Sequence, residues 1–220
     1  SIPVDIDCGR NWDYRFCLLL YSYFVVQALN QLGATTTMER YIGYIMNVVA
    51  DMGVDPLKPL YGISGSSMLT EEIVESLPGY RGMGPVRRGN QAFEQVQHDV
   101  YGAVVLSATQ FFFDNRLIKS GTEAEYHRLE VLGEHARSFY NQVDAGLWEY
   151  RGRQRQHTFS SMMCWAACDR LAKIATKLDK ADRADYWRKS ADDIRAYIFE
   201  GAWDPEQQSF TESFGRPEMD

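Results

Sequence analysis

The spacing of the connections between helical segments most constrains the fold of this chain. Apolar residues recur at the 3.6-residue helical period over six stretches, namely residues 14–32, 37–52, 90–117, 122–142, 160–178 and 181–199. Short connections at 33–36, 118–121 and 179–180 alternate with long connections rich in Gly, Pro and Ser at 53–89 and 143–159. Because a short connection makes two helices antiparallel neighbours, the sequence predicts three αα-hairpins whose long loops lie on one face.

Three such hairpins correspond to half of an (α/α)6 toroid, an all-α ring of helix pairs. An α-solenoid is the alternative, but the sequence shows no repeat with a period of about 34–47 residues. The third and fifth segments are apolar on more than one side, which is typical of helices with neighbours on both flanks. We therefore interpret residues 1–220 as one partial domain, the first half of a ring, that continues in a longer chain or self-associates through its open flanks.

Several helix boundaries carry sequence signals of their own. Glycines predict the ends of the first, second and sixth helices, at Gly33, Gly53 and Gly201. Thr36 or Thr37 is the predicted N-cap of the second helix, and Thr122 that of the fourth.

Charge and hydropathy limit the classes of partner. The formal net charge of −7 argues against a nucleic-acid or anionic-membrane partner, because an acidic surface attracts neither. Residues 1–10 have no signal-peptide pattern, and the apolar run at 16–29 is interrupted and too short to span a bilayer. We expect a cytoplasmic protein without a membrane or nucleic-acid partner.

The four cysteines give no metal-binding pattern. Cys164 and Cys168 are four residues apart in a helical segment and share a face, whereas Cys8 and Cys17 lie in the N-terminal region. No His or Cys cluster completes a tetrahedral ligand set around them. We expect Cys164 and Cys168 to be buried reduced thiols, and we expect no metal and no cofactor.

The stretch from Asp144 to Arg151 is the strongest chemical signal. It places Glu149 directly after Trp148 in a loop between two helical segments. A carboxyl group held against an indole has a raised pKa because desolvation disfavours its charged form. Such an acid can donate a proton near neutral pH, which is the first half of glycosidic bond cleavage. Asp13, Asp99 and Asp144 are the other available carboxylates, and no equally good second catalytic group stands out.

Six short motifs, in order, resemble glycoside hydrolase family 15, the glucoamylase, glucodextranase and trehalase family. They are Arg10-Asn-Trp-Asp-Tyr-Arg15; Tyr61-Gly-Ile-Ser-Gly65; Gly79-Tyr-Arg-Gly82 with Pro85-Val-Arg87 and Gly89-Asn90; Gln95 with Asp99-Val-Tyr-Gly102; Gly146-Leu-Trp-Glu149 with Arg151; and Met163-Cys-Trp165 with Asp169-Arg170. The resemblance implies an (α/α)6 barrel and exo-acting hydrolysis of α-glucosidic bonds with inversion, so the implied partner is an α-glucoside or oligosaccharide.

The resemblance also implies roles for individual residues. Glu149 falls on the general acid of the family, while Trp148 would pack on the sugar or on the acid and Arg151 would lie near the sugar hydroxyls. Trp12 and Tyr21 fall among the implied substrate-binding positions. The general base of the family belongs to the second half of the barrel, which this sequence does not include.

The sequence departs from the family pattern at positions that hold the sugar. Where the family reads Cys-Trp-Leu-Arg-Asp, this chain reads Cys17-Leu-Leu-Leu20-Tyr21, so Leu20 replaces the Arg and Tyr21 the Asp of a glucose-binding pair. Met83-Gly84 stands where Ser-Arg is common, and Ser161 stands where Lys often follows the Ser. Each lost charged hydrogen bond is worth about 1.5–3 kcal/mol. The replacements indicate a degenerate site or a shifted substrate.

Three functions are therefore compatible with the sequence. The first is the acid-bearing half of an inverting α-glucoside hydrolase that is inactive or impaired as this isolated chain. The second is a non-catalytic carbohydrate-binding or structural remnant. The third is a helical interaction module whose open flanks bind a partner or a second copy.

Overall fold

The computed structural model describes residues 3–52 and 55–219. The chain divides into two compact units. The first comprises Ser1–Leu18 and Lys58–Gln95, and the second comprises Leu19–Leu57 and Val96–Asp220.

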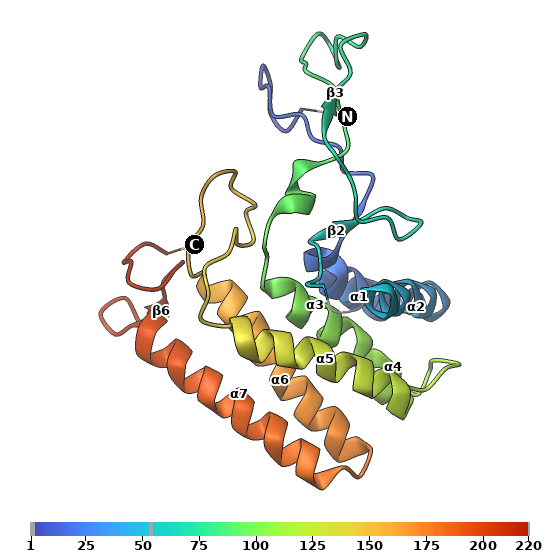
Figure 1. The fold of residues 1–220 in the computed structure, drawn as a ribbon, viewed down its shortest axis with the longest axis vertical. Helices are drawn as coiled ribbons and strands as arrows, with labels where there is room; N and C mark the ends of the chain where they lie inside the picture. Colours follow the sequence, from blue (N-terminus) through green and yellow to red (C-terminus); the bar gives the residue numbers. More distant parts are fainter. Residues whose placement is uncertain (1–2, 53–54, 220) are drawn as a thin grey trace. The chain divides into compact units, whose positions relative to one another are not determined.

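The second unit is helical and contains the predicted hairpins (Figure 1). Its elements are the 3-10 helix η1 (Leu19–Tyr21), the α-helices α1 (Ser22–Gln31), α2 (Thr35–Asp51), α3 (Asp99–Ala108), α4 (Gln110–Phe113), α5 (Glu123–Phe139), α6 (Thr158–Lys177) and α7 (Ala181–Ala202), and the short strands β5 (Trp203–Asp204) and β6 (Ser209–Phe210). The strands β5 and β6 pair antiparallel at the end of α7. The all-α fold predicted from the sequence is confirmed, and its hairpin elements fit an (α/α)6 barrel fragment.

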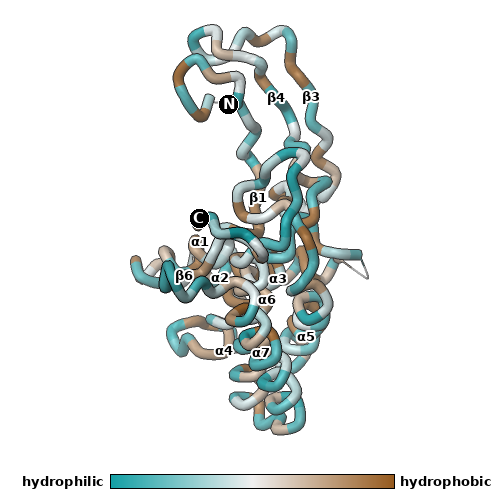
Figure 2. Tube along the Cα trace, turned by 90° about the vertical axis from the view of Figure 1, so that its left-hand side faces the viewer, coloured by the Kyte–Doolittle hydropathy of each residue, from teal (hydrophilic) through white to brown (hydrophobic). Residues whose placement is uncertain are grey.

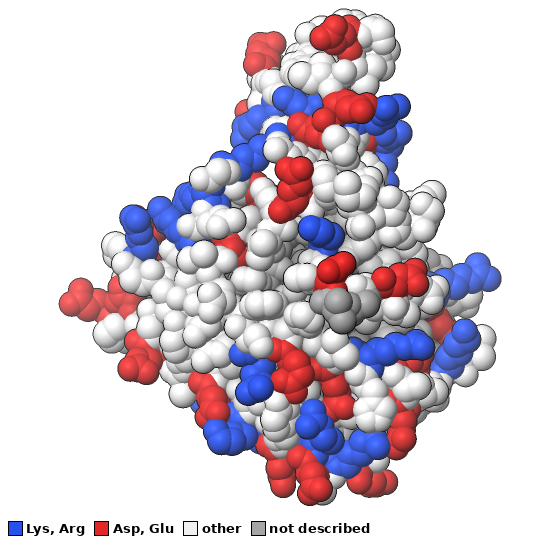
Figure 3. Space-filling model, in the orientation of Figure 1, with Lys and Arg blue, Asp and Glu red and all other residues white. Residues whose placement is uncertain are grey.

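Helices α3 and α6 form the centre of the second unit. Every residue of α3 from Asp99 to Ala108 is buried. Helix α6 packs against α3, α5 and α7, and its apolar side chains fill the space between them. Helices α5 and α7 are more polar on their outer faces, where acidic and basic side chains are interspersed (Figure 3). The contrast agrees with the sequence pattern, since all-round apolar helices are central and amphipathic ones peripheral.

The first unit is built from short strand pairs and a 3-10 helix. Strand β1 (Cys17–Leu18) pairs antiparallel with β2 (Leu60–Tyr61). Strand β3 (Glu72–Ile73) pairs antiparallel with β4 (Arg87–Arg88), and the two lie side by side in Figure 2. The 3-10 helix η2 (Gln91–Glu94) follows, and its N-cap Asn90 accepts a hydrogen bond from the backbone of Ala92. A small core joins these elements, made of Phe16, Leu18, Leu60, Leu69, Ala92 and Phe93.

Two predicted helices are shorter in the structure. The helix predicted over 14–32 begins only at Ser22, because Cys17 and Leu18 pair with β2 instead. The helix predicted over 90–117 is divided into η2, α3 and α4. Between η2 and α3 the backbone forms hydrogen bonds with the 144–145 segment instead of helical ones. Val96 O accepts from Ala145 N, and His98 N donates to the side chain of Asp144. Periodicity alone could not reveal that competition.

The predicted caps are partly confirmed. Thr122 is the N-cap of α5 and forms a reciprocal capping box with Glu125. The N-cap of α2 is Ala34, so the prediction of Thr36 or Thr37 is wrong. The predicted end of the second helix at Gly53 lies outside the described residues.

Glycine positions explain two further boundaries. Gly33 follows the C-cap of α1 with φ of +69°, as expected for a helix terminator. Helix α7 continues through Gly201 to Ala202, so the prediction that Gly201 ends it is wrong. A Cβ at Gly201 would lie 2.6 Å from Cδ1 of Phe214, so this glycine permits close packing of the Phe214 ring.

Within residues 3–52 and 55–219, no helix is both long and apolar enough to cross a bilayer. The same residues contain no group of three or more His, Cys, Asp or Glu side chains that could hold a metal ion. Cys164 and Cys168 are buried and have free thiols, and burial raises the pKa of Cys168 to about 12. These thiols are therefore protonated at neutral pH and pack as small apolar groups.

Helices α3 and α6 cross at Gly102. A Cβ at this position would lie 2.2 Å from the backbone carbonyl oxygen of Met163, so a larger residue would have to push two backbones apart. We predict that Gly102→Ala lowers the free energy of unfolding by about 1–3 kcal/mol. Gly43 in α2 is the matched control, because a Cβ there meets nothing within 4 Å. Gly43→Ala is expected to raise the free energy of unfolding by about 0.5–1 kcal/mol. Urea denaturation of both variants checks the prediction, and equal effects would contradict it.

Asp99 is a buried carboxyl group at the first position of α3. It is 0% exposed, and in the described part of the chain neither of its carboxylate oxygens has a hydrogen-bond partner. Burial raises the pKa of Asp99 from 3.8 to about 7, with smaller contributions from the negative charges of Asp144 and Glu149. The folded state therefore keeps a proton on Asp99 at pH values where the unfolded chain has lost it.

This difference predicts a specific pH dependence of stability. Between pH 4 and pH 7 the folded state binds more protons than the unfolded state, so the contribution of Asp99 to stability falls as pH rises. Asp99→Asn keeps the shape without the ionisation. We expect the free energy of unfolding of the variant to match that of the wild type near pH 4. The difference should then grow in favour of the variant up to about pH 7, to on the order of 4 kcal/mol. Denaturant unfolding of both proteins at pH 4, 6 and 8 measures this; parallel profiles would contradict the assignment.

Candidate active site

The loop that carries Glu149 connects α5 to α6 and is closed at its base. Asp144 N donates to Arg155 O at 2.8 Å, and Arg155 N donates to Asp144 O at 3.0 Å. This pair of bonds joins the two ends of the loop formed by residues 145–154. Glu149 lies within that loop, as the sequence predicted.

The backbone of this loop is held in an unusual conformation. Glu149 has φ of +53°, in the left-handed region that residues other than glycine rarely adopt. Glu149 N donates to Gly146 O at 3.2 Å, and Gly146 itself has φ of +69°. A Cβ at Gly146 would lie 2.4 Å from Cδ2 of the His157 ring. Backbone strain of this kind costs on the order of 1–3 kcal/mol and persists where the surrounding structure fixes it, commonly at functional sites.

The carboxyl group of Glu149 is half-buried and hydrogen-bonded. Its Oε1 accepts a hydrogen bond from Nε2 of Gln97 at 3.1 Å. Burial raises the pKa of Glu149, and the Gln97 hydrogen bond and the positive charge of Arg151 oppose that rise. The direction of this shift is the one that the sequence predicts, with burial as its main cause. A carboxyl group of this kind keeps its proton to a higher pH than an ordinary glutamate, which suits a general acid.

A fully buried carboxyl group, that of Asp144, holds the base of the same loop. Asp144 is 0% exposed, and its Oδ2 accepts hydrogen bonds from His98 N at 2.9 Å and from Ser160 Oγ at 2.7 Å. Asp144 therefore joins the loop to the residue before α3 and to the first turn of α6. Burial raises the pKa of Asp144 as well. With its oxygen used in this way, Asp144 is a structural group.

The predicted substrate-binding residues fall into two sets. Trp148 and Arg151 flank Glu149 in one loop, where the Trp148 side chain is 59% exposed and Arg151 is also exposed. Both are therefore accessible to a ligand beside the acid. Tyr21 ends η1 and precedes α1, and its side chain is 47% exposed. Trp12 belongs to the first unit, with the guanidinium of Arg87 4.6 Å from its ring centroid.

Trp12 lines a groove of about 590 Å³ within the first unit. Asp13 and Arg87 line the same groove. Asp13 accepts from the side chain of Arg15 at 2.8 Å and from Gly89 N at 3.1 Å, and the Arg15 contact lowers the pKa of Asp13. This carboxylate is ionised and already bonded, so it holds the local fold.

The positions that depart from the family pattern are used for packing. The side chain of Leu20 is 1% exposed and joins the core of the second unit. Ser161 Oγ donates to Tyr140 O at 2.6 Å and fastens α6 to the end of α5. In the first unit, Met83 O accepts from Nδ2 of Asn11 at 3.1 Å. Leu20 and Ser161 therefore have structural contacts in this fold.

Gln97 is the site residue that sequence reasoning missed. Its only sequence signal was its place two residues before Asp99 within the fourth motif, and a lone glutamine in a polar stretch does not indicate a role. The structure brings it to Glu149 because the predicted long helix is interrupted at residues 95–98.

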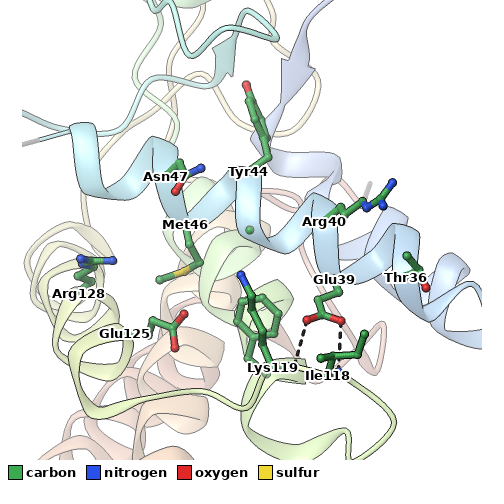
Figure 4. Close-up of a pocket in the computed structure, with 12 residues that line it drawn as sticks. Thr36, Glu39, Arg40, Tyr44, Met46, Asn47, Ile118, Lys119, Glu125 and Arg128 are labelled. Carbon is green, nitrogen blue, oxygen red and sulfur yellow. Dashed lines mark hydrogen bonds between the residues drawn. The ribbon is translucent and has the colours of Figure 1, made fainter.

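A groove of about 620 Å³ lies elsewhere in the second unit, between α2, the 114–122 connection and α5 (Figure 4). Its acidic side chains are occupied by backbone groups. Glu39 accepts from the backbone N–H groups of Ile118 and Lys119, drawn as dashed lines, and Glu125 accepts from the backbone of its N-cap Thr122. The groove therefore offers no carboxyl group suited to proton transfer.

Comparisons with known proteins agree with the motifs. A family model described as "Glycosyl hydrolases family 15" matches residues 2–219. A trehalase of Mycobacterium tuberculosis is 33% identical over 222 residues, which is 100% of this chain and 32% of the relative. A trehalase of Mycolicibacterium smegmatis is 32% identical over 200 residues, covering 90% of this chain and 30% of the relative.

A more distant trehalase, from Thermoplasma volcanium, is 28% identical over 224 residues, covering 100% of this chain and 34% of the relative. The chain therefore spans about a third of the length of these curated relatives. No solved structure matches the chain. Since the family model covers residues 2–219 and the six motifs occur in order along them, the chain belongs to family 15 of the glycosyl hydrolases.

Proposed function

We propose that residues 1–220 supply the proton-donating part of an inverting α-glucoside hydrolase of the trehalase type, with Glu149 as the general acid. The observation that carries the proposal is the half-buried Glu149 carboxyl group, held in a left-handed turn with a raised pKa. The matched relatives are named trehalases, so trehalose is the first substrate to test.

The chemistry requires two carboxyl groups. The protonated Glu149 would donate to the glycosidic oxygen as the bond between that oxygen and the anomeric carbon breaks. A carboxylate on the opposite face would remove a proton from the attacking water, at about 6.5–9.5 Å from the acid. Trp148 and Arg151, exposed on either side of Glu149, would bind the sugar ring and its hydroxyl groups.

The base would come from outside these residues. Asp144 is bonded to His98 and Ser160, and Asp99 is 0% exposed and out of reach of a ligand. Asp13 in the first unit is bonded to Arg15 and Gly89. We therefore assign the base to the part of the relatives' length that this chain does not span, and we expect residues 1–220 alone to be inactive or strongly impaired.

A non-catalytic carbohydrate-binding role is the second candidate. It is favoured by Leu20 and Ser161, which pack into the fold at positions where the family carries cations. Calorimetry with trehalose, maltose and isomaltose separates the two functions. Binding of a disaccharide without its turnover by the protein expressed from its complete reading frame would establish this second role.

The first test of the proposal is removal of the acid. In the protein expressed from its complete reading frame, Glu149→Gln is expected to lower kcat for trehalose hydrolysis by about 10²–10⁴-fold, because the amide cannot donate a proton to the leaving oxygen. Glu200→Gln, on the exposed face of α7, is the matched control and should keep wild-type activity. Glucose release from trehalose and maltose measures both. Full activity of Glu149→Gln would remove Glu149 from the reaction.

The second test is the pH dependence of turnover. Because the acid acts in its protonated form, kcat should fall as pH rises through the raised pKa of Glu149. Removing the nearby cation with Arg151→Met should raise that pKa further and move the alkaline limb of the kcat profile to higher pH. The displacement should be modest, since Arg151 is exposed and solvent screens its charge. A limb that moves to lower pH would contradict the assignment.

A further inference from the structure

We propose that Gln97 is the positioning residue of the acid: its side-chain amide holds the Glu149 carboxyl group in place in both of its protonation states. This inference rests on the proposed function, because it concerns the step in which Glu149 loses and regains a proton. It adds a residue from outside the catalytic loop to the machinery of that step.

The contact is one of three bonds from successive residues. Val96 O accepts from Ala145 N at 2.9 Å, Gln97 Nε2 donates to Glu149 Oε1 at 3.1 Å, and His98 N donates to Asp144 Oδ2 at 2.9 Å. The segment 96–98 therefore bonds to the base of the loop through its backbone and to the acid through the Gln97 side chain.

The segment that presents the amide is itself fixed. The Gln97 side chain is 2% exposed and that of His98 is 5% exposed. The His98 ring stacks on Phe139 with centroids 4.9 Å apart and planes at 16°. Residue 99 then begins α3, which is buried along its whole length. The amide is thus presented by a buried, packed segment.

An amide suits an acid that must change its protonation state. The carboxylate needs a donor, which Nε2 supplies, and the protonated carboxyl group needs an acceptor, which Oε1 supplies after a half-turn of the amide. A lysine or arginine at this position would favour the carboxylate, and an aspartate or glutamate would favour the protonated form. During turnover the proton passes from Glu149 to the leaving oxygen as the glycosidic bond breaks, and solvent later returns a proton. Gln97 can bond to Glu149 at both stages.

Other charged groups act on Glu149 in the same region. Arg151, in the same loop, lowers the pKa of Glu149, and the charge of Glu149 in turn helps to raise the pKa of Asp99 at the start of α3. His98 carries no opposing charge, because burial lowers the pKa of its imidazole. The titrations of Asp99 and Glu149 are therefore linked. Substitutions at Gln97 leave all of these groups in place, so differences between Gln97 variants report the contact itself.

The experiment measures the Glu149 carboxyl group directly. In the 220-residue chain labelled with ¹³C at the Glu side-chain carboxyl carbons, a pH titration follows the Glu149 resonance, which Glu149→Gln assigns. Gln97→Met has a similar volume without donors, so the pKa of Glu149 should rise relative to the wild type. Gln97→Glu keeps the shape of the side chain and can share one proton with Glu149, so the pKa of Glu149 should rise further than in Gln97→Met. Gln110→Met removes an amide bonded to Asn30 in α1 and is the matched control, with no change expected.

A second arm measures turnover in the protein expressed from its complete reading frame. Gln97→Met should lower kcat on trehalose about ten- to a hundredfold, while KM changes by less than about threefold, because the misplaced group acts in the transition state rather than in binding. Gln97→Glu should recover part of kcat on the acidic side of the profile, where the shared proton restores the bond.

The outcomes separate the two proposals. An unchanged Glu149 pKa in both Gln97→Met and Gln97→Glu, or an equal shift in Gln110→Met, would overturn the role of Gln97 whatever the activity shows. If Glu149→Gln keeps full activity, the proposed function fails and the role of Gln97 fails with it. A pKa shift together with the loss of kcat in Gln97→Met and its partial recovery in Gln97→Glu would support the positioning role. Should Gln97→Met fold poorly, the titration of Gln97→Glu decides the matter alone.

Discussion

The candidate site depends on the hydrogen bonds that the buried Asp144 side chain accepts. One oxygen accepts from the backbone before α3 and from Ser160 in the first turn of α6, while the backbone of Asp144 pairs with Arg155. A buried carboxylate left without such partners would carry a large desolvation penalty, so the three elements are held in one arrangement. The left-handed conformation of Glu149 is tolerable only because that arrangement fixes both ends of its loop. The geometry of Glu149 thus depends on a buried carboxyl group that anchors its loop.

Much of this arrangement could be predicted from the sequence, and the reasons for the remainder are physical. The alternation of short and long connections predicted the hairpins, and the Trp148-Glu149 pair predicted a desolvated acid. The division of the helix expected at 90–117 could not be predicted, because an apolar period says nothing about a loop some 50 residues later that competes for the backbone of Val96 and His98. Gln97 was missed for the same reason, since its role arises only where that helix is interrupted.

The charge pattern around Glu149 is compatible with a neutral amide, Gln97, among its direct partners. Asp99 and Asp144 are both 0% exposed, and Glu149 adds a third carboxyl group to the same region. Two buried negative charges beside a half-buried third would be unfavourable; burial keeps Asp99 protonated up to about pH 7, and hydrogen bonds stabilise Asp144. A buried cation beside Glu149 would stabilise its carboxylate and lower its pKa, so less of the group would stay protonated near neutral pH; the exposed Arg151 lowers that pKa under solvent screening. The amide of Gln97 orders the group and also lowers its pKa, while burial keeps that pKa raised overall.

The residues around the proposed acid and the residues at the implied sugar-binding positions differ in how far they keep the expected features. The proton-donating half keeps the features that are energetically expensive, namely a strained Glu149 backbone, a glycine that admits the His157 ring and a buried acid beneath the loop. At the positions where the resemblance implies sugar-binding charges, the chain has Leu20, Tyr21 and Ser161, and the side chains of Leu20 and Ser161 stabilise the fold. Strain that served no purpose would be relieved by a single substitution of Glu149 to glycine, whereas lost hydroxyl contacts can be replaced by other polar groups of a different sugar. The persistence of the strained acid beside altered sugar contacts therefore favours a changed substrate over a site that has simply decayed.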